Sequence, residues 1–130
     1  MYYIVYGMAQ DESDEPGSPE KWEVQLRKGS LELAILASLW GQKLYGLEIL
    51  RQLENGSDLI VSEGTVYPLL SRLKALGLLR SEWVESDAGH PRKYYSLTPL
   101  GKQRASDMAR SWTRFSASLN SLLVPLGKEK

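Results

Sequence analysis

Two stretches of this sequence decide how the chain is expected to fold. Residues 61–79 read VSEGTVYPLLSRLKALGLL, and residues 88–97 read AGHPRKYYSL. In the first stretch Ser62 is a residue type that begins helices, and Gly77 is a type that ends them in the left-handed conformation. The pattern between these two residues therefore predicts a helix from about residue 62 to residue 76.

The two sides of this predicted helix differ in composition. Apolar residues at helical spacing form one side, namely Val66, Leu69, Leu70, Leu73 and Leu76. The opposite side carries small, hydroxylic or basic residues, namely Gly64, Thr65, Pro68, Ser71 and Arg72. A helix with this outer side is suited to close approach to another molecule.

The second stretch predicts a hairpin that follows the helix directly. Leu79, residues 82–85 and residues 93–97 carry aromatic and branched side chains, and residues 86–91 are rich in turn formers. Arg92 and Lys93 make the end of the turn basic. A helix followed by a hairpin with a cationic tip predicts a winged helix. In that fold the helix would enter a groove of DNA and the hairpin, or wing, would touch the backbone beside it.

The remaining elements fit the same order. Residues 30–40 predict a buried first helix that ends at Gly41, and residues 44–55 predict a second helix. Residues 59–61 are interpreted as a short strand that pairs with the wing. Thr98 and Pro99 predict the start of a last helix, which should end at about Leu123, before Pro125. The expected fold class is mainly α with a small β-hairpin: a winged helix-turn-helix plus a C-terminal dimerisation helix.

The last helix carries an apolar seam with heptad spacing. Its members lie three and four residues apart: Ala105, Met108, Trp112, Phe115, Leu119 and Leu122. A seam of this kind would leave a large exposed apolar patch unless another helix covered it. The sequence therefore predicts a homodimer through this helix, with residues 22–26 as a further candidate contact.

Composition divides the 130 residues into four segments. Residues 1–20 are interpreted as a flexible acidic extension, residues 21–97 as the winged helix, residues 98–124 as the dimerisation helix and residues 125–130 as a tail. Residues 1–7 are either an extension upstream of a natural start at Met8 or a short element packed on the body. All 16 basic residues but only 11 of the 16 acidic ones follow residue 20, so residues 21–130 carry a net charge of about +5.

Several classes of function lack the residues they need. The chain has no cysteine, so it has no disulfide and no thiolate site, which fits a reducing cytoplasm. No apolar run approaches the roughly 18 residues of a membrane span, and no signal peptide is evident. The single histidine, His90, has only Asp87 nearby as a metal-binding or catalytic partner. We therefore expect no enzyme, no metal and no cofactor.

The sequence resembles the PadR family of bacterial transcriptional regulators. The resemblance lies in WEVQLRKG at residues 22–29, LYG at 44–46, SEGTVYPLL at 62–70, GLL at 77–79 and GHPRKYYSLTPLG at 89–101. It covers roughly residues 22–123, and its single C-terminal helix is similar to the compact branch of the family. It implies a cytoplasmic homodimeric repressor that binds palindromic promoter DNA. Some members of the family release DNA when they bind an aromatic small molecule.

Three sets of site residues follow. The candidate DNA-binding residues are Ser62, Gly64, Thr65, Tyr67, Pro68, Ser71, Arg72, His90, Arg92 and Lys93, although an arginine is common in the family where His90 stands. The six seam residues are the candidate dimer interface. Trp112 and Met108 are the candidate effector site, with the alternative that Trp112 only fills the dimer core.

The alternative function is a winged helix that binds protein, which should show apolar residues on the outer side of residues 62–76.

Overall fold

The computed structural model describes residues 19–55, 59, 61–87 and 89–127. The chain divides into two compact units, residues 1–31 and residues 32–130. In the first unit the described residues all belong to helix α1 (Pro19–Ser38), which continues into the second unit. Trp22, Val24 and Leu26 are exposed on the part of α1 in the first unit. The extension expected at residues 1–20 lies outside the described residues except for Pro19 and Glu20, which are helical.

The predicted start of the first helix at residue 30 is wrong. Helix α1 begins eleven residues earlier, at Pro19, and runs through Gly29 without a break. A glycine inside a helix costs about 1 kcal/mol relative to alanine, which good helix formers on both sides can offset. The helix ends at Ser38, and Gly41 then adopts a left-handed conformation with φ +74°, close to the predicted end.

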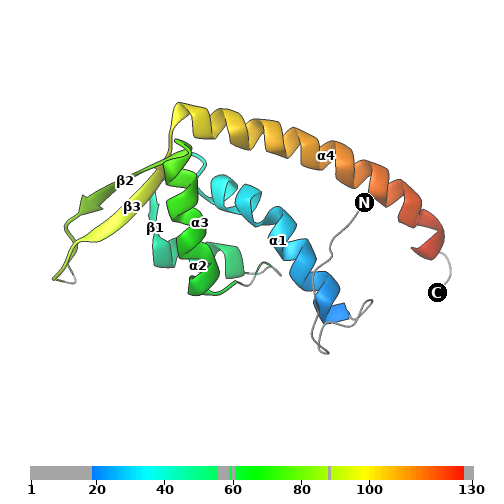
Figure 1. The fold of residues 1–130 in the computed structure, drawn as a ribbon, viewed down its shortest axis with the longest axis horizontal. Coiled ribbons are helices and arrows are strands. Elements are labelled where there is room, and N and C mark those ends of the chain that lie inside the picture. Colours follow the sequence, from blue (N-terminus) through cyan, green and yellow to red (C-terminus); the bar gives the residue numbers. More distant parts are fainter. Residues whose placement is uncertain (1–18, 56–58, 60, 88, 128–130) are drawn as a thin grey trace. The chain divides into compact units, whose positions relative to one another are not determined.

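The second unit contains the winged helix (Figure 1). Its elements in chain order are the end of α1, β1 (Leu44–Tyr45), α2 (Gly46–Glu54), α3 (Glu63–Ala75), β2 (Leu79–Val84), β3 (Arg92–Leu97) and α4 (Pro99–Gly127). The three strands form an antiparallel sheet in the order β1-β3-β2. The predicted fold class, a mainly helical winged helix with a C-terminal helix, is confirmed.

The third strand of the sheet is not where the sequence placed it. Leu44 pairs with Tyr95 and Tyr45 pairs with Tyr94, whereas the described residues of 59–61 are in no strand. Leu44 is buried in this position, and Tyr45 caps α2 while its backbone N–H donates to Oε1 of Glu48 at 3.1 Å. The two residues predicted to start the second helix are therefore a short strand that leads into it.

The core of this unit is formed by side chains with almost no exposed surface. They come from α1, α2 and α3, from the turn after α1 and from the residue before β2: Ile35, Leu36, Leu39, Ile49, Val66, Leu70, Leu73 and Leu78. The apolar side predicted for α3 is confirmed for Val66, Leu70 and Leu73, and Leu69 is half-buried. It is wrong for Leu76, which is 51% exposed because α3 ends there and Leu76 is its C-cap.

The start of α4 is fixed to the turn between α3 and β2. Thr98 donates from its hydroxyl to the carbonyl of Gly77 at 2.6 Å and accepts from the N–H of Gly101 at 3.0 Å. Its own backbone N–H donates to the carbonyl of Leu78 at 3.1 Å. Gly77 has φ +81°, the left-handed conformation that glycine adopts without strain. The motif TPLG at residues 98–101 thereby holds the C-terminal helix to the winged helix.

Helix α4 runs past its predicted end. It continues through Pro125 to Gly127 rather than stopping at about Leu123. Proline deprives one carbonyl of its helical partner, but residues 121–127 are exposed, so water can satisfy that carbonyl. The only buried residues of α4 are Gly101 and Ala105, so this helix contributes to the core of this unit through its first turns alone.

Candidate nucleic-acid interface

The outer side of α3 is open to solvent, as the sequence predicted. Its members are exposed: Ser62, Gly64, Thr65, Pro68, Ser71 and Arg72. Ser62 is the N-cap residue, but its side chain makes no capping hydrogen bond; its hydroxyl lies 3.3 Å from that of Thr65. None of these six side chains is a large apolar one, and two are hydroxyls that lie together at the start of the helix. This surface therefore lacks the apolar residues expected of a protein-binding winged helix.

Arg72 lies beside an acidic residue that sequence reasoning missed. One Nη of Arg72 is 3.7 Å from Oε2 of Glu32, which lies in the second unit near the end of α1. The side chain of Arg72 remains 67% exposed, whereas that of Glu32 is 26% exposed. A pair this open contributes little stability, so Arg72 can still reach a phosphate or a base edge.

Tyr67 connects the outer side of α3 to the core. It is 39% exposed, and its ring packs on Gly46 so closely that a Cβ built there would lie 2.3 Å from its Cε1 atom. Burial and, secondarily, the charge of Glu63 raise the pKa of Tyr67, while burial and then Tyr67 raise the pKa of Tyr95. Both phenols therefore stay protonated at neutral pH, and Tyr67, which is partly exposed, remains a candidate hydroxyl donor to a phosphate.

The wing carries its two predicted cations on opposite faces. Side chains alternate along a strand, so Lys93 shares a face with the buried Tyr95 and Leu97. The burial of Leu79, Tyr95 and Leu97 marks this as the core face of the wing, and α3 contacts β2. Lys93 pairs across the strands with Trp83, and its Nζ lies 5.8 Å from the Trp83 ring centroid. Trp83 is 68% exposed.

Arg92 lies on the other face of the wing within an aromatic cluster. Its Cζ is 4.5 Å from the ring centroid of Tyr45, and that ring meets Tyr94 edge-on at 5.4 Å. Lys43 lies 5.8 Å from the Tyr94 ring and 3.5 Å from Oε1 of Glu82. Arg92 is therefore partly buried against the strand that leads into α2, while Lys93 shares the face of α3.

His90 lies exposed in the turn of the wing. Its carbonyl accepts a hydrogen bond from the Ser86 hydroxyl at 2.7 Å, and Gly89 before it has φ +98°. No group of three metal-ligating side chains occurs among the residues that the structure describes. Within that same part of the chain, no helix has the length and apolar character to cross a membrane.

Sequence reasoning missed Trp83 as a member of this surface. Its neighbours in sequence, Glu82 and Val84, do not indicate which face of the hairpin Trp83 occupies. The signal lies in the strand register, which places Trp83 opposite Lys93 near the tip of a hairpin that projects away from α2 and α3 (Figure 1). Register could not be fixed from the sequence alone.

Comparison with known proteins identifies the family. The family model "Transcriptional regulator PadR-like family" matches residues 35–107, which contain the end of α1, the sheet, α2, α3 and the start of α4. The chain belongs to the PadR family. It is also 32% identical over 87 residues to "Transcriptional regulator Rv3488" of Mycobacterium tuberculosis, a match that covers 67% of this chain and 79% of that protein.

Solved structures of PadR proteins have the same fold. The X-ray structure of a PadR-like transcription factor from Bacteroides fragilis has 42% sequence identity and a TM-score of 0.64, with 78% of this chain and 97% of that chain covered. A PadR family regulator from Eggerthella lenta has 30% identity and a TM-score of 0.71, with 80% and 90% covered. This PadR-family chain is thus a transcriptional regulator built on a winged helix.

Proposed function

We propose that the protein is a sequence-specific DNA-binding repressor that acts as a homodimer on a palindromic operator and catalyses no reaction. In this proposal α3 enters the major groove, where Arg72 reads a base edge or a phosphate and Ser62, Thr65, Tyr67 and Ser71 bond the backbone. Gly64 and Pro68 allow close approach because they present little bulk. A regulator of bacterial promoters works where the chromosome is, so we place the protein in the cytoplasm.

The observation that carries this proposal is the composition of the exposed side of α3 together with the face of the wing beside it. The side of α3 offers hydroxyls and the guanidinium of Arg72, and the core face of the wing offers the ammonium of Lys93. The net charge of about +5 over residues 21–130 favours an anionic partner. His90 and Arg92 remain candidate phosphate contacts at the end of the wing, although Arg92 lies on the opposite face from Lys93.

We expect the protein to select specific fragments from genomic DNA in a pull-down followed by sequencing. Arg72→Ala should weaken binding to the best fragment by about tenfold, and it should relax the preference at one position if Arg72 reads a base edge. Arg114→Ala is the matched control, since it removes an exposed arginine from α4. If the wild type enriches no fragment over the input DNA at low salt and micromolar protein, the proposed function is wrong.

The homodimer would form through the apolar seam of α4. Beyond Ala105 no residue of α4 is buried, and the seam is exposed at Trp112 (46%), Phe115 (61%) and Leu122 (74%). The rings of Trp112 and Phe115 lie 6.3 Å apart and together form a continuous aromatic surface. At about 1.5 Å per residue this 29-residue helix is about 44 Å long, which gives a second copy ample surface to cover.

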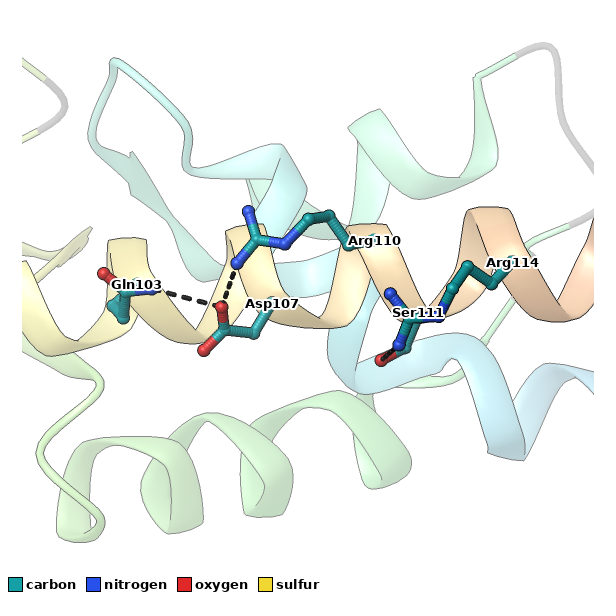
Figure 2. A network of polar contacts seen from close by, with 5 residues as sticks. All are labelled: Gln103, Asp107, Arg110, Ser111 and Arg114. Atoms are coloured by element: carbon teal, nitrogen blue, oxygen red, sulfur yellow. Dashed lines mark hydrogen bonds and ion pairs between the residues drawn. The ribbon is translucent and has the colours of Figure 1, made fainter.

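The polar residues of α4 occupy a different side of the helix. Nε2 of Gln103 donates to Oδ1 of Asp107 at 3.1 Å, Arg110 pairs with the same carboxylate, and Nη2 of Arg114 lies 3.5 Å from the Ser111 hydroxyl (Figure 2). These residues recur at three- and four-residue spacing, as the seam residues do, but with a different phase. An amphipathic helix of this kind would keep its polar side in water while its seam meets a partner helix.

The proposal includes an aromatic effector that binds between the two copies of α4. Trp112 lies in the middle of the seam with Met108 one turn before it, so twofold symmetry would bring two indoles close together, where they could hold a flat ligand. If they do, titration with flat aromatic compounds should quench tryptophan fluorescence in the wild type and not in Trp112→Phe. Quenching that persists in the variant, or is absent from the wild type, would leave Trp112 as a core residue of the dimer.

A further inference from the structure

We propose that Trp83 is a DNA-contacting residue of the wing, whose indole enters the minor groove next to the major-groove site of α3. This inference rests on the proposed function and assigns a residue that the family motifs and the exposed side of α3 do not include. It also predicts that Lys93, whose ammonium lies beside the Trp83 ring, contacts a phosphate.

The position of Trp83 along β2 places it on the core face but beyond the core. Leu79, Ser81 and Trp83 are alternate residues and share one face, and they pair with Leu97, Tyr95 and Lys93 in turn. Exposure rises along this row from 3% at Leu79 to 68% at Trp83. The row therefore begins in the core under α3 and ends in solvent with the largest side chain of the wing.

The residues around Trp83 are suited to contact with a nucleic acid. The ammonium of Lys93 lies 5.8 Å from the Trp83 ring and 5.9 Å from the Tyr95 ring, and Tyr95 in turn lies near enough to Tyr67 for its pKa to respond. Trp83, Lys93 and Tyr95 thus form a row along the wing that runs from the exposed Trp83 to the buried Tyr95. In a DNA complex the cation can contact a backbone phosphate while the neighbouring aromatic ring enters the groove beside that phosphate. Proteins that bind the minor groove often insert apolar side chains between base steps.

The test compares four single variants on a fragment that the wild type selects. Trp83→Ala should weaken binding by about tenfold with an unchanged dependence on salt, because no charge is lost. Lys93→Gln should weaken binding and reduce the salt slope by about 1. Arg114→Gln, the matched control that removes the same charge from an exposed position on α4, should keep the wild-type slope. Trp40→Ala, which removes another exposed tryptophan (54%), should bind like the wild type.

Modified DNA tests the groove. Replacing guanine by inosine removes the amino group from the minor groove and leaves the major-groove edge unchanged, so a wedge should enter the modified step more easily. Inosine in the flank protected by the wing should therefore tighten binding by the wild type and by Trp40→Ala but not by Trp83→Ala. The same substitution at the centre of the α3 site should not distinguish the variants.

The outcomes separate this inference from the proposed function. A wild type that selects no fragment contradicts the proposed function. A wild type that binds while Trp83→Ala loses no more than Trp40→Ala overturns the role of Trp83 alone and makes the exposed face of the wing a surface for a protein partner. An equal salt slope in Arg114→Gln and Lys93→Gln would overturn the phosphate contact assigned to Lys93. Since Trp83 is 68% exposed, each variant should retain its wild-type circular dichroism.

Discussion

Phe115→Asp is expected to convert the protein into a folded monomer that binds its operator at least about 100-fold more weakly. The side chain is 61% exposed in a single chain, so the substitution removes no intramolecular core contact. In a twofold interface it would place two carboxylates near one another within an apolar seam, and burial of unpaired charge is strongly unfavourable. The loss of affinity follows because one winged helix then binds without the effective concentration that a linked second one provides.

Sedimentation equilibrium at micromolar protein measures the change in assembly, and a binding titration on the same samples measures the change in affinity. Ala117→Asp is the matched control, because residue 117 is exposed on α4 on the side away from the seam. It adds the same charge to the same helix and should remain a dimer. A wild type that sediments as a monomer, or a Phe115→Asp protein that stays dimeric, would rule out the seam as the interface.

The features that the sequence predicted correctly are those fixed within one helical turn or one hairpin. The spacing of Val66, Leu70 and Leu73 needs only the helical period to define a buried side. Thr98 acts as the cap of the last helix because hydroxyl and N–H lie within three residues of each other. The exposed side of α3 follows from the same period, so the candidate site on that helix could be outlined from the sequence.

Several of the features that were missed depend on strand register or on partners far away in the chain. Leu44 and Tyr45 are a strand only because β3 follows about 50 residues later, and locally they look like the start of a helix. Trp83 and Lys93 face the same side as α3 because of the register between β2 and β3, which composition does not determine. The ion pair between Glu32 and Arg72 likewise requires the packing of α1 beside α3. Such contacts arise from tertiary packing and leave no periodic pattern.

Gly101→Ala is expected to be the most destabilising exchange of a glycine in the described part of α4. A Cβ at residue 101 would lie 2.0 Å from the carbonyl oxygen of Leu78 and 3.3 Å from Cδ2 of Leu97. The first neighbour is backbone, which cannot rotate away as a side chain can, so α4 would have to move. That movement would stretch the hydrogen bonds from Thr98 to Gly77 and from the N–H of Gly101 to Thr98. Overpacking together with a weakened cap should cost about 2 to 4 kcal/mol.

Urea unfolding at one fixed protein concentration measures this cost, since the stability of a dimer depends on concentration. Gly29→Ala is the matched control, because residue 29 is also helical and a Cβ there meets nothing within 4 Å. It should raise the free energy of unfolding by up to about 1 kcal/mol. The two substitutions should change the free energy of unfolding in opposite directions because the surroundings of the two glycines differ. Equal urea midpoints for the two variants would mean that residue 101 does not anchor α4.

Because the same junction sets the direction of α4 relative to α3, any dimer that Gly101→Ala still forms should hold its two α3 helices at an altered separation. Its affinity for the operator should then fall by more than its loss of stability explains.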